Sequence, residues 1–234
     1  MQGVSIQGFR LSPQQKHLWL LQQGVNSQPY RVQSAVIIEG NLNFLLLESA
    51  LQKVIEKYEI LRTNFQALPG MNVPLQVITA NRLPILHYHD LTDLNPETQH
   101  SQIEALLNEM KQLHFDVEKG AVLDIALVII APNKQILLVS LPGMNSDAVS
   151  IENFVRETSC FYAADLQNQE WVDQPLQYVD IAEWQNELFA GEEVEVGKKY
   201  WQTKDLSGLA NWQLPQENIP AQKLDLNLNL FSLI

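Results

Sequence analysis

The spacing of apolar residues along the chain predicts an order of helices and strands. Between Leu47 and Tyr58 the apolar residues keep the three- and four-residue spacing of an amphipathic helix. A similar spacing with fewer apolar positions predicts four further helices, over residues 96–113, 152–166, 178–188 and 192–201.

Aliphatic and β-branched residues dominate three other segments, 30–39, 122–130 and 135–141, which favours strands. The short sequence APNK joins the last two segments and predicts an antiparallel pair. Shorter strands are expected on both sides of the turn at Gly70 and around Leu86. The sequence LDLNLNLFSL, residues 224–233, also alternates like a strand, but one without an evident partner.

The first helix has a clear start signal in the sequence. Ser12 is placed to cap it, Pro13 takes its first position and Gln15 completes a capping box. Gly24 is placed to end this helix. The mixed order of elements predicts the α+β class, an α/β two-layer sandwich with a mixed, largely antiparallel sheet flanked by helices.

Length and charge narrow the choice of partners. The 234 residues, 46% of them hydrophobic, suffice for one large domain or two small ones with a real core. A formal charge of -12 gives no attraction to phosphate backbones, so nucleic acid is not expected as a partner. Without a membrane-length apolar run or a signal peptide, the chain is expected to be soluble and cytoplasmic, without a membrane partner. The single cysteine, Cys160, excludes an internal disulfide.

The sequence SLPGMNSDAVS, residues 140–150, lies between a predicted strand and a predicted helix. Asn145 and Ser146 can donate hydrogen bonds to an oxyanion, and the backbone amide of Gly143 can be approached closely. A structural role is favoured for them, because polar loop residues usually satisfy their own turn. Asp147 can orient an amine, although a helix cap or an ion pair is favoured there as well.

The five histidines offer no clear site. His87 and His89 lie two apart in a predicted strand beside Asp90, which resembles part of a metal site. No third ligand follows at a defined spacing, so ordinary strand histidines are favoured. Surface or packing roles are expected for the others, His17, His100 and His114.

Four stretches resemble, in order, the conserved blocks at the start of condensation domains of nonribosomal peptide synthetases. LSPQQKHLWLL (11–21) is similar to the opening block, and KYEILRTNF (57–65) to the block Arg-His-Glu-x-Leu-Arg-Thr-x-Phe. HFDVEKGAVLDIALV (114–128) is similar to the segment Phe-Asp-Leu-x-x-Gly-Pro-Leu, and YVDIAEWQ (178–185) to Tyr-x-Asp-x-Ala-x-Trp-Gln. Any one match is weak, but together and in this order they identify the chain as a member of the family.

The resemblance covers roughly residues 7–215 and implies the chloramphenicol acetyltransferase-like fold, in which two α/β lobes form a V around a tunnel. It implies that residues 1–170 form the amino-terminal lobe. Residues 171–234 would form a helical linker and the start of the carboxy-terminal lobe. The remaining blocks of that second lobe are absent from this sequence.

The implied reaction joins an acyl or peptidyl thioester on one carrier protein to an amino acid on the next, forming an amide. Both thioesters arrive on phosphopantetheine arms, so no directly bound cofactor or metal is expected. The implied partners are peptidyl or acyl carrier proteins and neighbouring synthetase domains. Because carrier proteins tend to be acidic like this chain, docking would rely on a local patch such as Lys198, Lys199 and Lys204 or on apolar contact. A homodimer through the uncovered apolar face of the lobe is also expected.

In the family, the loop at residues 142–148 carries the motif His-His-x-x-x-Asp-Gly, whose second histidine lies by the attacking amine. Aligned on Asp147, this sequence has Pro142 and Gly143 at the histidine positions and Ala148 at the glycine position. The family's aspartate pairs with the arginine of the Leu-Arg-Thr block, so an ion pair between Arg62 and Asp147 is expected. We therefore expect amide formation to be absent or strongly altered.

Two other functions stay open, and with them the question of whether the chain is an enzyme. One is a non-catalytic carrier-docking or interdomain scaffold, and the other is an acyltransferase of the same fold that uses coenzyme A. The replaced histidines favour the scaffold. Arg62 and Asp147 do not distinguish these functions from one another, because both residues would be needed to hold the loop in every case.

Overall fold

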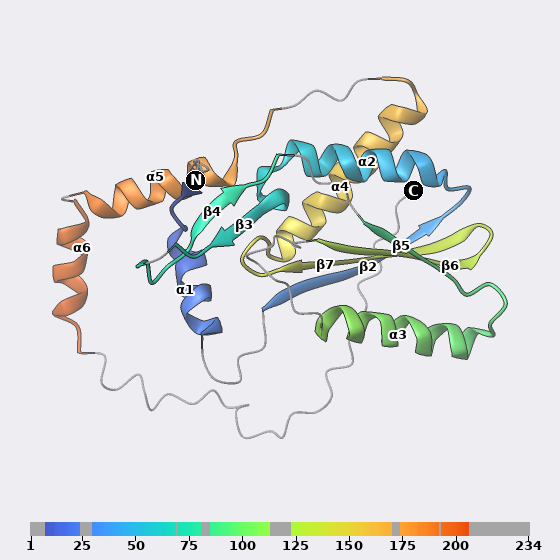
Figure 1. Ribbon diagram of the computed structural model, residues 1–234, viewed down its shortest axis with the longest axis horizontal. Coiled ribbons are helices and arrows are strands. Elements are labelled where there is room, and N and C mark those ends of the chain that lie inside the picture. Colours follow the sequence, from blue (N-terminus) through green and yellow to red (C-terminus); the bar gives the residue numbers. More distant parts are fainter. Residues whose placement is uncertain are drawn as a thin grey trace, which may run out of the picture.

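The computed structural model of the protein describes residues 8–23, 30–68, 70–80, 85–112, 123–169, 174–191 and 193–205. Every helix and strand predicted within these residues is present, with ends shifted by a few residues, whereas Gly24 and residues 224–233 lie outside them. Figure 1 shows the arrangement of the elements and labels all of them except β1 and η1. The elements are β1 (Gly8–Phe9), α1 (Pro13–Gln22), β2 (Arg31–Glu39), α2 (Phe44–Lys57), η1 (Glu59–Arg62), β3 (Thr63–Gln66), β4 (Leu75–Ile78), β5 (Leu86–Asp90), α3 (Pro96–Gln112), β6 (Asp124–Ala131), β7 (Lys134–Pro142), α4 (Ala148–Leu166), α5 (Tyr178–Ala190) and α6 (Glu193–Gln202).

Four strands form the main sheet in the order β2-β7-β6-β5. β7 is antiparallel to β2 and to β6, while β5 runs parallel to β6. α2 and α4 cover one face of this sheet, and α3 covers the other (Figure 1). The predicted α+β class, with a mixed and largely antiparallel sheet flanked by helices, is confirmed. α3 adds a third layer to the two that were expected.

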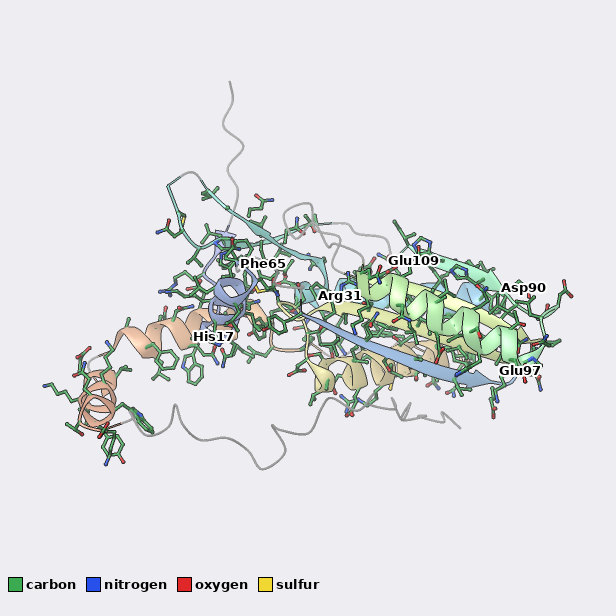
Figure 2. All side chains as sticks on the ribbon, turned by 90° about the horizontal axis from the view of Figure 1, so that it is seen from below. His17, Arg31, Phe65, Asp90, Glu97 and Glu109 are labelled. Atoms are coloured by element: carbon green, nitrogen blue, oxygen red, sulfur yellow. The ribbon has the colours of Figure 1, made fainter. Side chains whose placement is uncertain are left out.

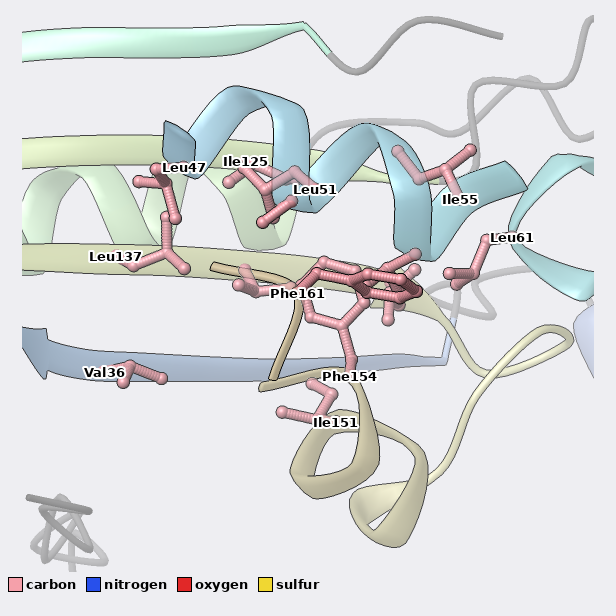
Figure 3. Packing of buried hydrophobic residues seen from close by; sticks show 14 of the residues in the cluster. Val36, Leu47, Leu51, Ile55, Leu61, Ile125, Leu137, Ile151, Phe154 and Phe161 are labelled. Atoms are coloured by element: carbon pink, nitrogen blue, oxygen red, sulfur yellow. The ribbon is translucent and has the colours of Figure 1, made fainter. Parts of the chain in front are cut away.

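The main core lies between the sheet and the helices α2 and α4. Leu47, Leu51 and Ile55 follow helical spacing on α2 and are buried against the sheet. Figure 3 shows them close to Phe154 and Phe161 of α4. Burying an apolar side chain of this size contributes about 1.5–3 kcal/mol relative to leaving it exposed. The cluster therefore fixes α4, and with it the loop that precedes α4, on the sheet.

A second, three-stranded sheet has the order β1-β4-β3, and both of its pairs are antiparallel. β1 has only two residues, too few to show the alternation that predicts a strand from sequence. Leu11, Phe65 and Met144 form a buried cluster that joins this sheet to α1 and to the loop after β7. The smaller sheet thus helps to position that loop.

α5 packs against α1 and η1 of the preceding segment. Asn186 Nδ2 donates to Leu11 O over 2.8 Å, and Gln177 Nε2 donates to Lys57 O over 3.0 Å. These contacts do not locate a domain boundary, so the division into residues 1–170 and 171–234 stays a prediction. Among the helices of the described segments, none is long and apolar enough to cross a membrane.

Candidate functional site

The loop from Gly143 to Asp147 joins the end of β7 to the start of α4. Asp147 Oδ1 accepts hydrogen bonds from Ser150 N at 2.8 Å and from Ser150 Oγ at 2.6 Å. These bonds, first of all the one from the Ser150 side chain, hold the pKa of the Asp147 carboxyl below its usual value. Asp147 is therefore the cap of α4, one of the two structural roles considered for it.

The ion pair expected between Arg62 and Asp147 does not form, which corrects that prediction. Nη1 of Arg62 donates to Thr79 O at 3.0 Å, and its Nη2 lies 3.4 Å from Oε1 of Glu59. Thr79 in turn donates to Arg62 O through its backbone N and its Oγ1. The guanidinium is held at the end of β4, while the carboxylate of Asp147 is used by its own helix.

Asn145 ties the loop to η1 and β3. The residue is only 6% exposed, and its Nδ2 donates to Ile60 O at 2.9 Å and to Thr63 O at 3.3 Å. An amide nitrogen carries two protons, and both are used by these carbonyls. Asn145 therefore cannot also donate to an oxyanion in this arrangement, contrary to the catalytic role considered for it.

The other two groups considered as oxyanion donors are engaged in the same way. Ser146 Oγ donates to Pro142 O over 3.0 Å, so its side chain satisfies its own turn. The backbone N of Gly143 donates to Tyr30 O over 2.7 Å. All of these groups hold the loop in place, and as it stands the loop offers none of them to a substrate.

Gly143 lies so close to Tyr30 that a side chain has little room. A Cβ at residue 143 would lie 3.0 Å from the Cβ of Tyr30 and 3.2 Å from its carbonyl oxygen. The glycine is needed for this close approach of two backbone segments. Gly143 also occupies the position at which the resemblance places the second histidine. The backbone of Tyr30 leaves little room for any side chain at this position.

Two buried glutamines connect the loop to α1 and β4. Gln15 Nε2 donates to Met144 O at 3.0 Å and to Gln76 Oε1 at 3.1 Å, and Gln76 Nε2 donates to Arg10 O at 2.8 Å. Gln15 Oε1 accepts from Ser12 N at 2.9 Å, so the predicted capping box is confirmed. The sequence predicted only this capping role for Gln15. A polar residue inside the short apolar strand LQVI was the one available signal for Gln76.

A pocket of about 430 Å³ lies beside the loop, bordered by α1 and α5. Asn145 and Gln185 line it, and each has a buried side-chain oxygen to which no described residue donates a hydrogen bond. At its margin Tyr178 Oη shares a 2.8 Å hydrogen bond with Ser12 Oγ. Among the described residues that line this pocket, none is a histidine.

A second polar cluster, not predicted from the sequence, lies on the face of the main sheet that α3 covers. Arg31, labelled in Figure 2, donates from Nη1 to Met110 O and, over 3.0 Å, to Ser140 Oγ. Burial lowers the pKa of Arg31 to about 10, although the nearby Asp124 acts in the opposite direction. Since Arg31 pairs with Pro142 in the sheet, this cluster attaches the end of α3 close to the loop.

The histidines do not form a metal site in the part of the chain that is described. His87 Nε2 lies 4.0 Å from Asp124 Oδ1 and its side chain is 57% exposed, and His100 pairs with Glu104 on the surface. No group of three or more His, Cys, Asp or Glu residues in the described ranges could hold a metal ion. His114 lies outside those ranges.

Comparison of the sequence with known families gives a match over most of the chain. The family described as "Condensation domain" matches residues 6–231. Chondramide synthase cmdD of Chondromyces crocatus is 30% identical over 211 residues, which is 89% of this chain and 5% of that protein. Tyrocidine synthase 3 of Brevibacillus parabrevis is 30% identical over 224 residues, 94% of this chain and 3% of that protein. The chain therefore spans a small fraction of these relatives.

Solved structures share the fold. The starter condensation domain of rhizomide synthetase RzmA superposes with a TM-score of 0.74 at 20% identity, covering 89% of this chain and 49% of that chain. SgcC5 of Streptomyces globisporus gives a TM-score of 0.72 at 24% identity, covering 85% and 46%. The X-domain solved with OxyB from teicoplanin biosynthesis gives 0.72 at 23%, covering 90% and 45%. The expected fold is confirmed, and this chain corresponds to about half of each solved chain.

Proposed function

Since the chain belongs to the condensation domain family, we propose that it is the amino-terminal half of a condensation domain of a nonribosomal peptide synthetase. Such a domain joins an acyl or peptidyl thioester on one carrier protein to an amino acid on the next, forming an amide. We further propose that amide formation is absent or strongly altered in this chain, because Pro142 and Gly143 replace the two histidines.

The observation that carries this proposal is the set of hydrogen bonds that the loop after β7 donates to other parts of the lobe and to its own turn. The donors of Gly143, Asn145 and Ser146 all serve carbonyls of the protein itself. General base catalysis is typically worth about 10² to 10⁴ in rate, so losing a histidine alone would slow a complete domain. Positioning contributes effective molarities of about 10⁵ M or more, and it needs a substrate site walled on both sides.

The proposed substrates are thioesters carried on phosphopantetheine arms, and no directly bound metal or nucleotide is proposed. The pocket beside the loop suits one feature of such an arm, its amide N–H groups. Asn145 and Gln185, which line the pocket, retain buried acceptor oxygens without a donor among the described residues. Both oxygens are buried, so each side chain would have to turn toward the pocket before a bound N–H group could satisfy an acceptor that is otherwise costly to leave unpaired.

The second candidate function is a non-catalytic carrier-docking or interdomain scaffold. Its support is the exposed surface of α5 and α6, where Trp184 and Trp201 are 61% and 63% exposed. Large exposed aromatic residues are typical of surfaces that contact another protein. Lys198 and Lys199 of α6 are exposed as well and would attract an acidic carrier protein, although Lys198 also pairs with Glu195.

The chemistry is tested by mixing loaded donor and acceptor carrier proteins with the chain and searching for the amide product by mass spectrometry. We expect no more product than in a mixture without the chain. A condensation domain with both histidines, given the same carriers, is the positive control. Clear amide product from this chain would contradict the proposed loss of activity.

The scaffold function is tested by calorimetric titration of the chain with carrier proteins. The double substitution Lys198→Glu and Lys199→Glu is expected to weaken binding about tenfold, which corresponds to about 1.4 kcal/mol. Lys16→Glu, an exposed position on α1, is the matched control and should bind as the unmodified chain does. Binding that ignores the double substitution would exclude the α6 lysines as the docking site.

A further inference from the structure

An apolar pocket of about 320 Å³ lies in the main core, between α4 and the sheet. Val36 of β2, Leu137 of β7 and Leu47 of α2 line it, and Figure 3 shows these three side chains on neighbouring elements of the core. The pocket shares no lining residue with the pocket beside the loop after β7. It is therefore a separate site, which the proposed function does not use.

The volume of this pocket exceeds what close packing usually leaves inside a protein. Folded cores contain few voids larger than a water molecule. An engineered apolar cavity of about 150 Å³ takes up a benzene molecule, so a volume about twice as large has room for a chain of roughly ten carbon atoms. Pockets of this size lined mainly by apolar side chains are typical sites for small molecules.

Small side chains on α4 leave this space open. Ser159 and Ala163 lie one helical turn apart on the face of α4 that lines the pocket, between the larger Val155 and Leu166. Ala163 is exposed, and Leu166 is 56% exposed. The pocket therefore opens to solvent beside the carboxy-terminal end of α4, and a ligand can enter there.

One hydroxyl group in the lining has a hydrogen to donate. Thr158 and Ser159 each donate, over 2.8 Å, to a carbonyl of their own helix. Tyr162 Oη accepts from Asn43 N over 2.9 Å, but no described residue accepts the hydroxyl hydrogen of Tyr162. A tyrosine hydroxyl can accept and donate at once. Tyr162 therefore retains a donor for an oxygen atom of a ligand.

The lining favours an uncharged ligand. Among the described residues around this pocket there is no lysine, arginine or histidine that could pair with a carboxylate. Burying an ionised group without a partner is far more costly than burying a neutral one. A neutral carbonyl oxygen needs a single donor, and the hydroxyl of Tyr162 supplies it.

We propose that this pocket binds an uncharged aliphatic molecule of roughly ten carbon atoms that carries a carbonyl group at one end, such as a ketone or an ester. The chain lies between Val36, Leu137 and Val155, and the carbonyl oxygen accepts the hydrogen of Tyr162 Oη. A single donor and an apolar wall thus determine the chemical class of the ligand.

This ligand is not presented to the loop after β7. Tyr162 lies 15 residues after Asp147, which corresponds to about 22 Å along α4 at 1.5 Å per residue. The carbonyl group is therefore remote from the loop, and the ligand is not a substrate there. Binding does not require amide formation, so the inference goes beyond the proposed function and does not rest on it.

Titration of the unmodified 234-residue chain with 2-decanone, followed through methyl groups by NMR, tests the site. We expect a dissociation constant of about 10–100 µM. Nuclear Overhauser contacts should join the ligand to the methyl groups of Val36 and Val155. The methyl groups of Val149, which is exposed on α4 outside the pocket, should not respond. No saturable binding, or an equal response of Val149, would overturn the proposal.

Sodium decanoate tests the preference for an uncharged ligand, because it has the same number of carbon atoms and a carboxylate at its end. It is expected to bind at least about tenfold more weakly than 2-decanone at neutral pH. Equal affinity for the two compounds would contradict the assigned class of ligand.

Two variants test the two features of the pocket separately. Ser159→Leu fills the pocket and should weaken binding of 2-decanone at least about tenfold, whereas Asn153→Leu, at an exposed position of α4, should leave it unchanged. Tyr162→Phe removes the donor and should weaken binding about three- to tenfold. Melting temperatures show that each variant is folded. Equal binding by Ser159→Leu and Asn153→Leu would contradict the proposed site, and unchanged binding by Tyr162→Phe would contradict the hydrogen bond.

Discussion

Nε2 of Gln15 donates a 3.0 Å hydrogen bond to the main-chain oxygen of Met144, and this bond joins α1 to the loop between β7 and α4. Both residues are buried. The two residues are 129 positions apart in the sequence. Their bond is one of several that hold this loop from the side of α1, η1 and β4. The position of the loop is therefore a property of the whole lobe.

Replacing Gln15 by leucine removes its bonds to Met144 and to Gln76 while keeping the side-chain volume. Buried acceptors would be left without donors, and we expect the free energy of unfolding to fall by about 2–4 kcal/mol. Urea denaturation measures the change. Gln14→Leu, at an exposed position of the same helix, should stay within about 0.5 kcal/mol. Similar losses in both variants would show that the Gln15 bonds are not responsible.

Alanine substitutions at two glycines should have opposite effects. At Gly143 a Cβ would lie 3.0 Å from the Cβ of Tyr30, so Gly143→Ala is expected to destabilise the fold by about 1–3 kcal/mol. At Gly197, in helix α6, an added Cβ would have no described atom within 4 Å apart from its chain neighbours and the backbone of its own helix. Gly197→Ala should therefore stabilise by about 0.5–1 kcal/mol through the higher helix propensity of alanine. Thermal denaturation of both variants compares them, and a tolerated Gly143→Ala would contradict the close packing described.

The carboxyl of Asp147 should make stability depend on pH in the acid range. Hydrogen bonds from Ser150 lower its pKa in the folded chain, so its contribution is present above the ordinary value near 3.9 and is lost as pH falls through the lowered one. The unfolding free energy of the unmodified chain should thus fall more steeply below about pH 4 than that of Asp147→Asn. Denaturation curves at a series of pH values measure this, and parallel curves would argue against the cap.

A buried carboxylate in place of Asn145 would face two carbonyl oxygens instead of donating to them. We expect Asn145→Asp to destabilise the fold by about 3 kcal/mol at neutral pH. Desolvation raises the folded-state pKa of the new carboxyl, so the loss should shrink as pH falls and the group becomes protonated. Asn168→Asp, at an exposed position, is the control. A loss that does not change with pH would mean that the side chain does not face the carbonyls of Ile60 and Thr63.

The sequence predicted what depends on local signals. The capping box of Ser12 and Gln15 and the helical spacing from Leu47 to Ile55 need only neighbouring residues, and both appear in the structure. β1 was not predicted because a two-residue strand has no period of its own and exists only through its pairing with β4. Local patterns therefore predicted the longer helices and strands. The short strand β1 depends on long-range pairing, which these patterns do not contain.

The candidate site shows the same division more sharply. The resemblance placed Arg62 and Asp147 together, but the carbonyl of Thr79 and the amino-terminal end of α4 compete for these side chains and take them. The contacts of Asn145 with Ile60, and of Gly143 with Tyr30, join residues distant in sequence. Such partners follow from the tertiary arrangement, so a motif alone could not predict them.

The central claim is that the donors of the loop after β7 are used by the protein itself, and the backbone amide of Gly143 tests it most directly. Its hydrogen-exchange rate can be measured by NMR on the unmodified chain. With a 2.7 Å hydrogen bond to Tyr30 O, this amide is expected to exchange at least about 100-fold more slowly than in an unfolded chain. Exchange at the rate of an open loop would contradict the account, because the amide would then be free to bind a substrate.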